Sequence, residues 1–261
     1  MAKSLSALLL LCSSLWQTLW AQEVTIVAGP ILDIINQQGT GPYQQILHQA
    51  AQRSGIELVE TFYPLKRAVE TFKHKKSLAI YLMIDAFKEE ISRNEIITTY
   101  PIGIYKLYIF TRKDQTAISS YAQLKGKRVG GVFGYEGSYQ SLINRGIQVY
   151  YISDEKAQLD KLNNGRVDAI LGFLPDWLPY LEQLNYDESF PVDIGYDYIV
   201  VWNTPQGQAF VDKISPALQQ MKHEGTLKKI LADHYLDFDY KVTKTFEWQP
   251  TDKSQPNTSE P

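Results

Sequence analysis

Two stretches of sequence decide the expected fold: LKGKRVGGVFG at Leu124–Gly134 and LNNGRVDAILG at Leu162–Gly172. Each is a polar turn that leads into a short apolar strand, and each strand runs into a glycine. A helix is expected to start at Glu136–Ser138, so that backbone N–H groups point at a small anion or polar ligand. Because the two units lie about one βαβ repeat apart, they predict neighbouring parallel strands beside a small-molecule cleft.

The same alternation of strands and helices extends over the rest of the chain. Short apolar runs predict strands, and apolar residues at helical spacing predict helices. This order is typical of an α/β fold with parallel sheets flanked by helices. The predicted strands are 24–28, 56–63, 78–84, 105–111, 128–132, 148–152, 168–171 and 196–202. The predicted helices are 43–53, 65–72, 120–124, 139–144, 156–163 (N-cap Ser153), 176–184 (starting at Pro175), 210–224 and 227–235.

The order of these elements predicts two lobes joined by two crossings of the chain. The first lobe is expected to comprise residues 22–112 and 196–245, and the second residues 113–195. Residues 1–21 would be a signal peptide, and the Pro-, Ser- and Thr-rich residues 246–261 a disordered tail. A cleft between the lobes, at the carboxyl ends of strands, is the expected ligand site.

The N-terminus has the pattern of a cleaved export signal. Lys3 is the only charged residue before Glu23, Leu8–Leu11 is apolar, and cleavage is expected near Ala21. An uncleaved membrane anchor is the alternative reading of the same run. Cleavage would remove the single cysteine, Cys12, so the mature chain would have no disulfide. Export without disulfides favours the bacterial periplasm.

Composition and motifs exclude several classes of function. The net charge of −3 and the lack of a basic stripe argue against a nucleic-acid partner. The four histidines have no metal-ligand spacing, and neither a nucleophile elbow nor a phosphate loop is present. We therefore expect no metal, no cofactor and no enzymatic activity.

An ordered set of motifs resembles the family 3 bacterial extracellular solute-binding proteins, the periplasmic receptors of polar amino-acid ABC importers. The resemblance covers nearly the whole mature chain and implies the two-lobed type II periplasmic-binding-protein fold. It further implies a small polar solute as ligand and a membrane permease as partner; we expect a monomer. The matching segments are Gly41–Tyr43, Tyr63–Ala68, Tyr100–Ile102, Leu124–Gly130, Leu162–Ala169 and Met221–Leu227.

The resemblance also points to two ligand anchors. Family members grip the ligand carboxylate with an arginine about nine residues before a Tyr-Pro-like turn; Ser92 has that spacing here, and Arg93 is the candidate one residue later. A solvated helix charge is the alternative for Arg93. The family's aspartate for the ligand ammonium would fall near Gly172 and Phe173, and Asp176 follows three residues later. Without that counter-charge, an α-amino acid would leave its ammonium unpaired.

Other candidates come from the residues themselves. Ser138 could receive a carboxylate at a helix start, or act as an ordinary cap. The aromatic residues Tyr43, Tyr135 and Phe173 could line the cleft, or belong to the core. Arg67 could face the cleft or brace the first lobe.

Three functions remain open at this stage. The first is a binding protein that closes over a solute and docks on an ABC permease. The second is a sensor that reports to a membrane receptor. The third is a dehydratase-type enzyme on the same fold, with Glu136 as acid or base; a surface carboxylate is the alternative for Glu136.

Overall fold

The computed structural model describes residues 23–82 and 91–240. Its strands are β1 (Glu23–Ala28), β2 (Glu57–Phe62), β3 (Ala79–Leu82), β4 (Ile96–Thr98), β5 (Gly103–Arg112), β6 (Val129–Val132), β7 (Val149–Ile152), β8 (Ala169–Leu174), β9 (Leu184–Asn185) and β10 (Asp193–Trp202). Its α-helices are α1 (Pro42–Ser54), α2 (Leu65–Lys73), α3 (Gln140–Ile143), α4 (Glu155–Asn163), α5 (Pro205–His223) and α6 (Thr226–Leu231). Short 3₁₀ helices cover Arg93–Glu95, Tyr121–Leu124, Glu136–Tyr139, Leu178–Tyr180 and Ala232–His234.

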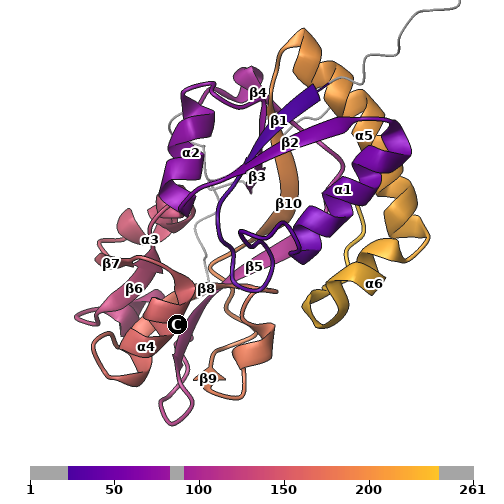
Figure 1. The fold of residues 1–261 in the computed structure, drawn as a ribbon. Coiled ribbons are helices and arrows are strands. Elements are labelled where there is room, and N and C mark those ends of the chain that lie inside the picture. Colours follow the sequence, from indigo (N-terminus) through magenta and orange to yellow (C-terminus); the bar gives the residue numbers. More distant parts are fainter. Residues whose placement is uncertain (1–22, 83–90, 241–261) are drawn as a thin grey trace, which may run out of the picture.

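Strand β10 connects the two halves of a curled sheet. Its first residues, Asp193–Asp197, pair antiparallel with β5, and residues 198–202 pair with β3 and β4. The main strand order is β2-β1-β3-β10-β5-β8-β6-β7, and off this path β4 pairs with β10 and β9 with β5. The predicted strands 24–28 and 128–132, which correspond to β1 and β6, therefore belong to one continuous set of hydrogen-bonded strands but lie near its opposite ends. Figure 1 shows the two ends as separate lobes, with β10 passing between them.

The first lobe is a sheet with helices on both faces. Strands β1, β2 and β3 are parallel, and β10 returns antiparallel beside β3. Helices α1, α5 and α6 pack together on one face of this sheet, while α2 covers the other (Figure 1). The long apolar stripes of these helices explain the packing, because each needs a partner surface to bury it.

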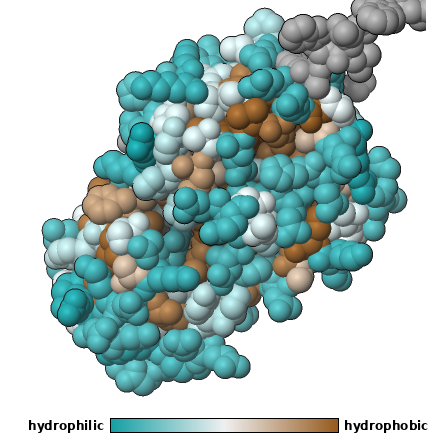
Figure 2. Space-filling view, viewed as in Figure 1, coloured by the Kyte–Doolittle hydropathy of each residue, from teal (hydrophilic) through white to brown (hydrophobic). Residues whose placement is uncertain are grey.

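The second lobe is built around β8, β6 and β7, which run parallel, with β5 antiparallel at the side of β8. Residues 106–110 of β5 already pair with β8 of the second lobe. The chain therefore passes from the first lobe to the second nearer Gly103 than residue 112, the boundary expected from the sequence. The exact division of the lobes stays a prediction. The face seen in Figure 2 is mostly hydrophilic, with apolar residues in separate patches.

Most predicted elements agree with the structure within a few residues, and two predictions are wrong. The N-cap of α4 is Asp154, whose side chain accepts a hydrogen bond from the Ala157 N–H at 2.8 Å; Ser153 instead donates to Asp154. The helix expected over 176–184 is reduced to the 3₁₀ helix Leu178–Tyr180. Pro179 lacks the N–H that a continuous α-helix would need there.

An ion pair fixes the turn between α4 and β8. Asp168 accepts hydrogen bonds from the backbone N–H and the guanidinium of Arg128, both at 2.8 Å, and the same guanidinium bonds the Gly165 carbonyl. These bonds from Arg128 lower the pKa of Asp168 to about 2. Asp168 thus braces the turn after Gly165.

We predict that Asp168→Asn lowers the free energy of unfolding by about 1 kcal/mol at pH 7, since the pair is partly screened by solvent. The folded pKa lies below the ordinary value of 3.8, so the stabilisation is present above about pH 4 and is lost as pH falls toward 2. Urea unfolding at pH 7 and pH 3 measures this. The exposed Asp160 on α4 provides the control, Asp160→Asn, and an unchanged difference at pH 3 contradicts the assignment.

Candidate functional site

Three polar side chains follow three neighbouring parallel strands of the second lobe. Tyr135 comes three residues after the end of β6, Glu155 three residues after β7, and Asp176 two residues after β8. Because β8, β6 and β7 are parallel and adjacent, these residues meet at the carboxyl edge of one sheet. That edge is where ligands bind in open α/β sheets.

Local structure directs these side chains inward. Glu155 is the first residue of α4, and only 6% of it is exposed. Tyr135 is the N-cap residue of the 3₁₀ helix Glu136–Tyr139, and its ring centroid lies 5.0 Å from that of Phe173 in β8. Asp176 is also buried, with 7% exposed. The edge therefore presents a carboxyl, a phenol and an aromatic face in close succession.

The first lobe adds a phenol that binds the crossing strand. The Tyr43 hydroxyl on α1 donates a 2.7 Å hydrogen bond to Asp197 Oδ2, at the point in β10 where pairing passes from β5 to β3. This approach requires a glycine at position 103, because a Cβ there would lie 2.4 Å from the Tyr43 hydroxyl oxygen. Tyr43 and Asp197 thus connect α1 to the crossing.

Burial governs the electrostatics of this site. It raises the pKa of Glu155 to about 7, and it raises the pKa of Asp197 to about 6 against the opposing hydrogen bond from Tyr43. The pKa of Asp176 is raised well above its usual value, first by burial and then by the charges of Asp197 and Glu155. Burial followed by carboxyl charges also raises the pKa of Tyr43 and Tyr135. Burial is thus the first cause of the raised pKa in each of the five groups.

The two lobes touch at one side of this site through the start of α2. The Lys66 ammonium lies 3.8 Å from Glu136 Oε1 and 5.3 Å from the ring centroid of Phe133. The other carboxylate oxygen of Glu136 accepts a 2.7 Å hydrogen bond from the Gly134 N–H. A Cβ on Gly134 would lie 2.7 Å from Leu65 Cγ, so this contact depends on glycine.

A second interlobe contact lies at another edge. The Tyr180 hydroxyl donates to Asp33 Oδ2 at 2.9 Å, and His234 Nδ1 lies 3.3 Å from the Pro175 carbonyl oxygen. Asp33 and His234 belong to the first lobe, while Pro175 and Tyr180 belong to the second. The described residues of the two lobes are therefore in contact at two places.

The predicted site residues lie in several places. Tyr135, Phe173 and Asp176 lie at the carboxyl edge of the second lobe, and Ser138 adjoins them, since its backbone N–H donates a 3.0 Å hydrogen bond to the Tyr135 carbonyl.

The other three candidates are placed elsewhere by their described contacts. Tyr43 bonds Asp197 at the crossing. Arg67 is exposed on α2 with its guanidinium 4.6 Å from the ring centroid of Tyr63, and Arg93 is partly exposed in the 3₁₀ helix Arg93–Glu95. The ligand roles of all these residues stay predictions.

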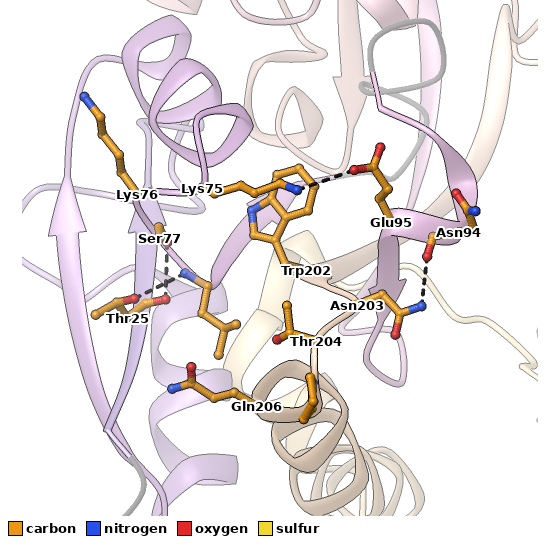
Figure 3. A pocket seen from close by; sticks show the side chains of 12 residues that line it. Thr25, Lys75, Lys76, Ser77, Asn94, Glu95, Trp202, Asn203, Thr204 and Gln206 are labelled. Carbon is orange, nitrogen blue, oxygen red and sulfur yellow. Dashed lines mark hydrogen bonds and ion pairs between the residues drawn. The ribbon is translucent and has the colours of Figure 1, made fainter.

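The neighbours of Arg93 line a different concavity, shown in Figure 3. This pocket of about 710 Å³ lies where β10 ends and α5 begins, and the Lys75 ammonium lies 3.4 Å from Glu95 Oε1 beside it. Trp202, in its wall, is five residues along β10 from Asp197, or about 17 Å at strand rise. Its lining residues are Thr25, Lys75, Lys76, Ser77, Leu78, Asn94, Glu95, Trp202, Asn203, Thr204, Pro205 and Gln206.

Sequence reasoning missed Asp197 and Glu155. Asp197 interrupts the apolar strand YDYIVVW, and a carboxylate inside such a run is an unusual choice that could have drawn attention to it. Glu155 reads as an ordinary acidic residue in the first turn of a helix, where the dipole favours negative charge. Nothing in the sequence distinguishes it from a solvated residue.

Two other kinds of site are not found in the described part of the chain. Within residues 23–82 and 91–240, no helix is both long and apolar enough to cross a membrane. In the same residues, no group of three or more His, Cys, Asp or Glu side chains has the geometry to hold a metal ion.

Comparisons with solved structures define the fold. The chain aligns with a mutant of ArgBP from T. maritima at a TM-score of 0.65 and 17% identity, covering 82% of this chain and 95% of that one. The GluR0 ligand-binding core from Nostoc punctiforme in complex with L-glutamate gives a TM-score of 0.68 at 17% identity, covering 81% and 99%. The protein therefore has the two-lobed type II periplasmic-binding-protein fold.

A curated relative is also similar to this chain in sequence. ABC transporter arginine-binding protein 1 of Escherichia coli (strain K12) is 26% identical over 181 residues, covering 67% of this chain and 72% of the relative. No family model matches the chain. The resemblance to family 3 solute-binding proteins is nevertheless supported by this relative, and the solved structures agree with the fold that it implies.

We predict that Gly134→Ala disfavours the closed arrangement, because its φ of +103° and the Leu65 contact both oppose a Cβ. The ligand-free protein should show a larger radius of gyration in small-angle scattering. Gly146→Ala is the matched control: φ is +78°, and no atom lies within 4 Å of the place that its Cβ would take. Both variants should lose about 1 kcal/mol of stability from backbone strain, so only the contact with Leu65 distinguishes them. If the two variants have the same radius of gyration, the contact does not hold the closed arrangement.

We predict that the ligand-free protein loses thermal stability between pH 5 and pH 8. The pKa values of Asp197 (about 6) and Glu155 (about 7) are raised in the folded state, so their stabilising effect is present at low pH and is lost as pH rises through these values. Calorimetric melting temperatures measure the slope. Glu155→Gln should flatten it, whereas Glu182→Gln, at an exposed position, should not.

Proposed function

We propose that this protein is an exported solute-binding protein that closes its lobes around an amino-acid-like solute. The observation that carries the proposal is the meeting of Tyr135, Glu155 and Asp176 at the carboxyl edge of the second lobe, opposite Tyr43 and Asp197. Such an edge at the interface of two lobes is where a small ligand is enclosed. The interlobe contacts on both sides would hold the closed state.

The proposal includes the periplasm as location, with the signal cleaved near Ala21, and the permease of an ABC importer as partner. The similarity to an ABC transporter arginine-binding protein supports this partner. Ligand contacts made only in the closed state would shift the equilibrium toward closure. The permease would then recognise the surface of the closed form. The protein would act as a monomer without a cofactor.

A sensor role is the second candidate. It is favoured by the similarity to the GluR0 ligand-binding core, since the same clamp can serve signalling. An enzymatic role has less support, because the carboxylate of Glu136 is engaged by the Gly134 N–H and faces Lys66. Pull-down of a permease or of a receptor by the liganded protein separates import from sensing.

We predict that a solute raises the melting temperature of the purified full-length secreted protein in a thermal-shift screen. The screen should include the common amino acids, amines and carboxylates, and native mass spectrometry should report any solute that co-purifies. Ligand at 100 times its Kd adds about 2.7 kcal/mol of stability, which is roughly 5–10 °C for a chain of this length. The absence of any shift and of any bound mass would reject the proposal.

A further inference from the structure

A pocket of about 550 Å³ lies at the end of the second lobe's sheet that is opposite to the carboxyl edge. Arg128 immediately precedes β6 and Gln148 immediately precedes β7, and both residues line the pocket. Because β6 and β7 are parallel neighbours of four residues each, they separate this pocket from the carboxyl edge by about 13 Å. We call it the amino-end pocket, and its argued lining residues are Tyr121, Lys125, Lys127, Arg128, Arg145 and Tyr150.

The described lining of the amino-end pocket is cationic and contains no acidic residue. Lys125, Lys127 and Arg145 are exposed and take part in none of the ion pairs of the described residues. Arg128 differs, because its guanidinium bonds Asp168 at 2.8 Å. Asp168 also responds to the charge of Lys127, but it lies outside the lining. In a chain of net charge −3, the pocket is therefore a local concentration of positive charge.

Aromatic contacts position Arg145 at the pocket. Its guanidinium lies 4.5 Å from the ring centroid of Tyr121, and that ring meets Phe190 edge-on with 5.0 Å between centroids. A ring contacts the face of a guanidinium, so the N–H donors at the edge of Arg145 stay available. Tyr150 adds a ring that is 43% exposed, and its hydroxyl donates a 3.2 Å hydrogen bond to Gln148 Oε1. The pocket thus combines a positioned guanidinium with ammonium groups and an exposed aromatic ring.

We propose that the amino-end pocket binds a phosphoryl group, held by the Arg145 guanidinium and the Lys125 ammonium. Paired guanidinium N–H groups match the spacing of phosphate oxygens, and a lysine ammonium adds a compact charge. A phosphate monoester carries about two negative charges at neutral pH, which the cations of this pocket can compensate. A volume of about 550 Å³ accommodates a small organic phosphate, either free or as the headgroup of a lipid. This site is separate from the carboxyl edge and goes beyond the proposed function.

The test is titration calorimetry on the full-length secreted protein at physiological ionic strength. The probe is sn-glycerol 3-phosphate, and glycerol is its neutral counterpart. Exposed charges are screened beyond about 8 Å under these conditions, so a general attraction of anions contributes little. We expect saturable binding of the phosphate ester, with one molecule per chain, and no binding of glycerol.

Substitutions connect this binding to the pocket. The double variant Lys125→Gln/Arg145→Gln should weaken binding of glycerol 3-phosphate by about tenfold or more, because hydrogen bonds from charged donors are lost. The matched control, Lys156→Gln/Lys213→Gln, removes two charges at exposed positions of α4 and α5 and should bind like the parent. Melting temperatures of both double variants should stay near that of the parent, since all four side chains are exposed.

Vesicle sedimentation distinguishes the two sources of the phosphoryl group. The vesicles are phosphatidylcholine containing phosphatidic acid, with phosphatidylcholine alone as the control. Binding to the phosphatidic acid vesicles that Lys125→Gln/Arg145→Gln loses would assign a lipid headgroup. Binding of glycerol 3-phosphate without binding to these vesicles would assign a free phosphate ester. Either result supports the phosphoryl site.

Three results would overturn the phosphoryl site. The first is failure of both glycerol 3-phosphate and the phosphatidic acid vesicles to bind. The second is an equal loss of binding in the control double variant, which would indicate an effect of net charge. The third is binding that Lys125→Gln/Arg145→Gln leaves unchanged, because the phosphate would then bind elsewhere on the chain. The proposed solute-binding function is tested separately by the thermal-shift screen and stands or falls independently of these results.

Discussion

The structure depends on one strand that belongs to both lobes. In β10, backbone hydrogen bonds join Asp193–Asp197 to β5 and residues 198–202 to β3 and β4, so any movement of the lobes must bend the chain near this change of partner. The Tyr43 hydroxyl binds Asp197 at that point. Helix α1 and the crossing are therefore connected through the side chain of a single carboxylate.

Burial is the main cause of the raised pKa values of Glu155 and Asp176. A carboxyl in a dry environment favours its neutral form, so a conformational change that admits water to these residues would return their pKa values toward the ordinary range.

The fold could be predicted from the sequence to a large extent, because its elements are set by local patterns. The strand before Gly134 and the helix ending at Gly55 both follow from apolar runs and glycines. The helix over 176–184 was predicted wrongly, because the prediction gave helix propensity more weight than Pro179. In the structure the proline limits the helix to one short 3₁₀ turn.

The candidate site was predictable only in part. Tyr43, Tyr135, Phe173 and Asp176 could be named because aromatic and acidic residues after strands draw attention, and the structure places the last three at one edge of a sheet. Asp197 and Glu155 could not, because their importance comes from burial, which tertiary packing sets and the local sequence does not show. Whether Arg93 reaches a ligand is likewise decided by tertiary geometry and not by its spacing from Tyr100 and Pro101.

The position of Trp177 has an optical consequence. Its indole is 1% exposed, follows Asp176 in the chain and packs where a Cβ on Gly172 would lie 2.3 Å from Nε1. Indole emission responds to nearby charge, so a change in the ionisation of the adjacent carboxyl would alter its fluorescence. The protein therefore carries its own spectroscopic reporter beside the carboxyl edge, while Trp202 lies beyond the crossing as an internal reference.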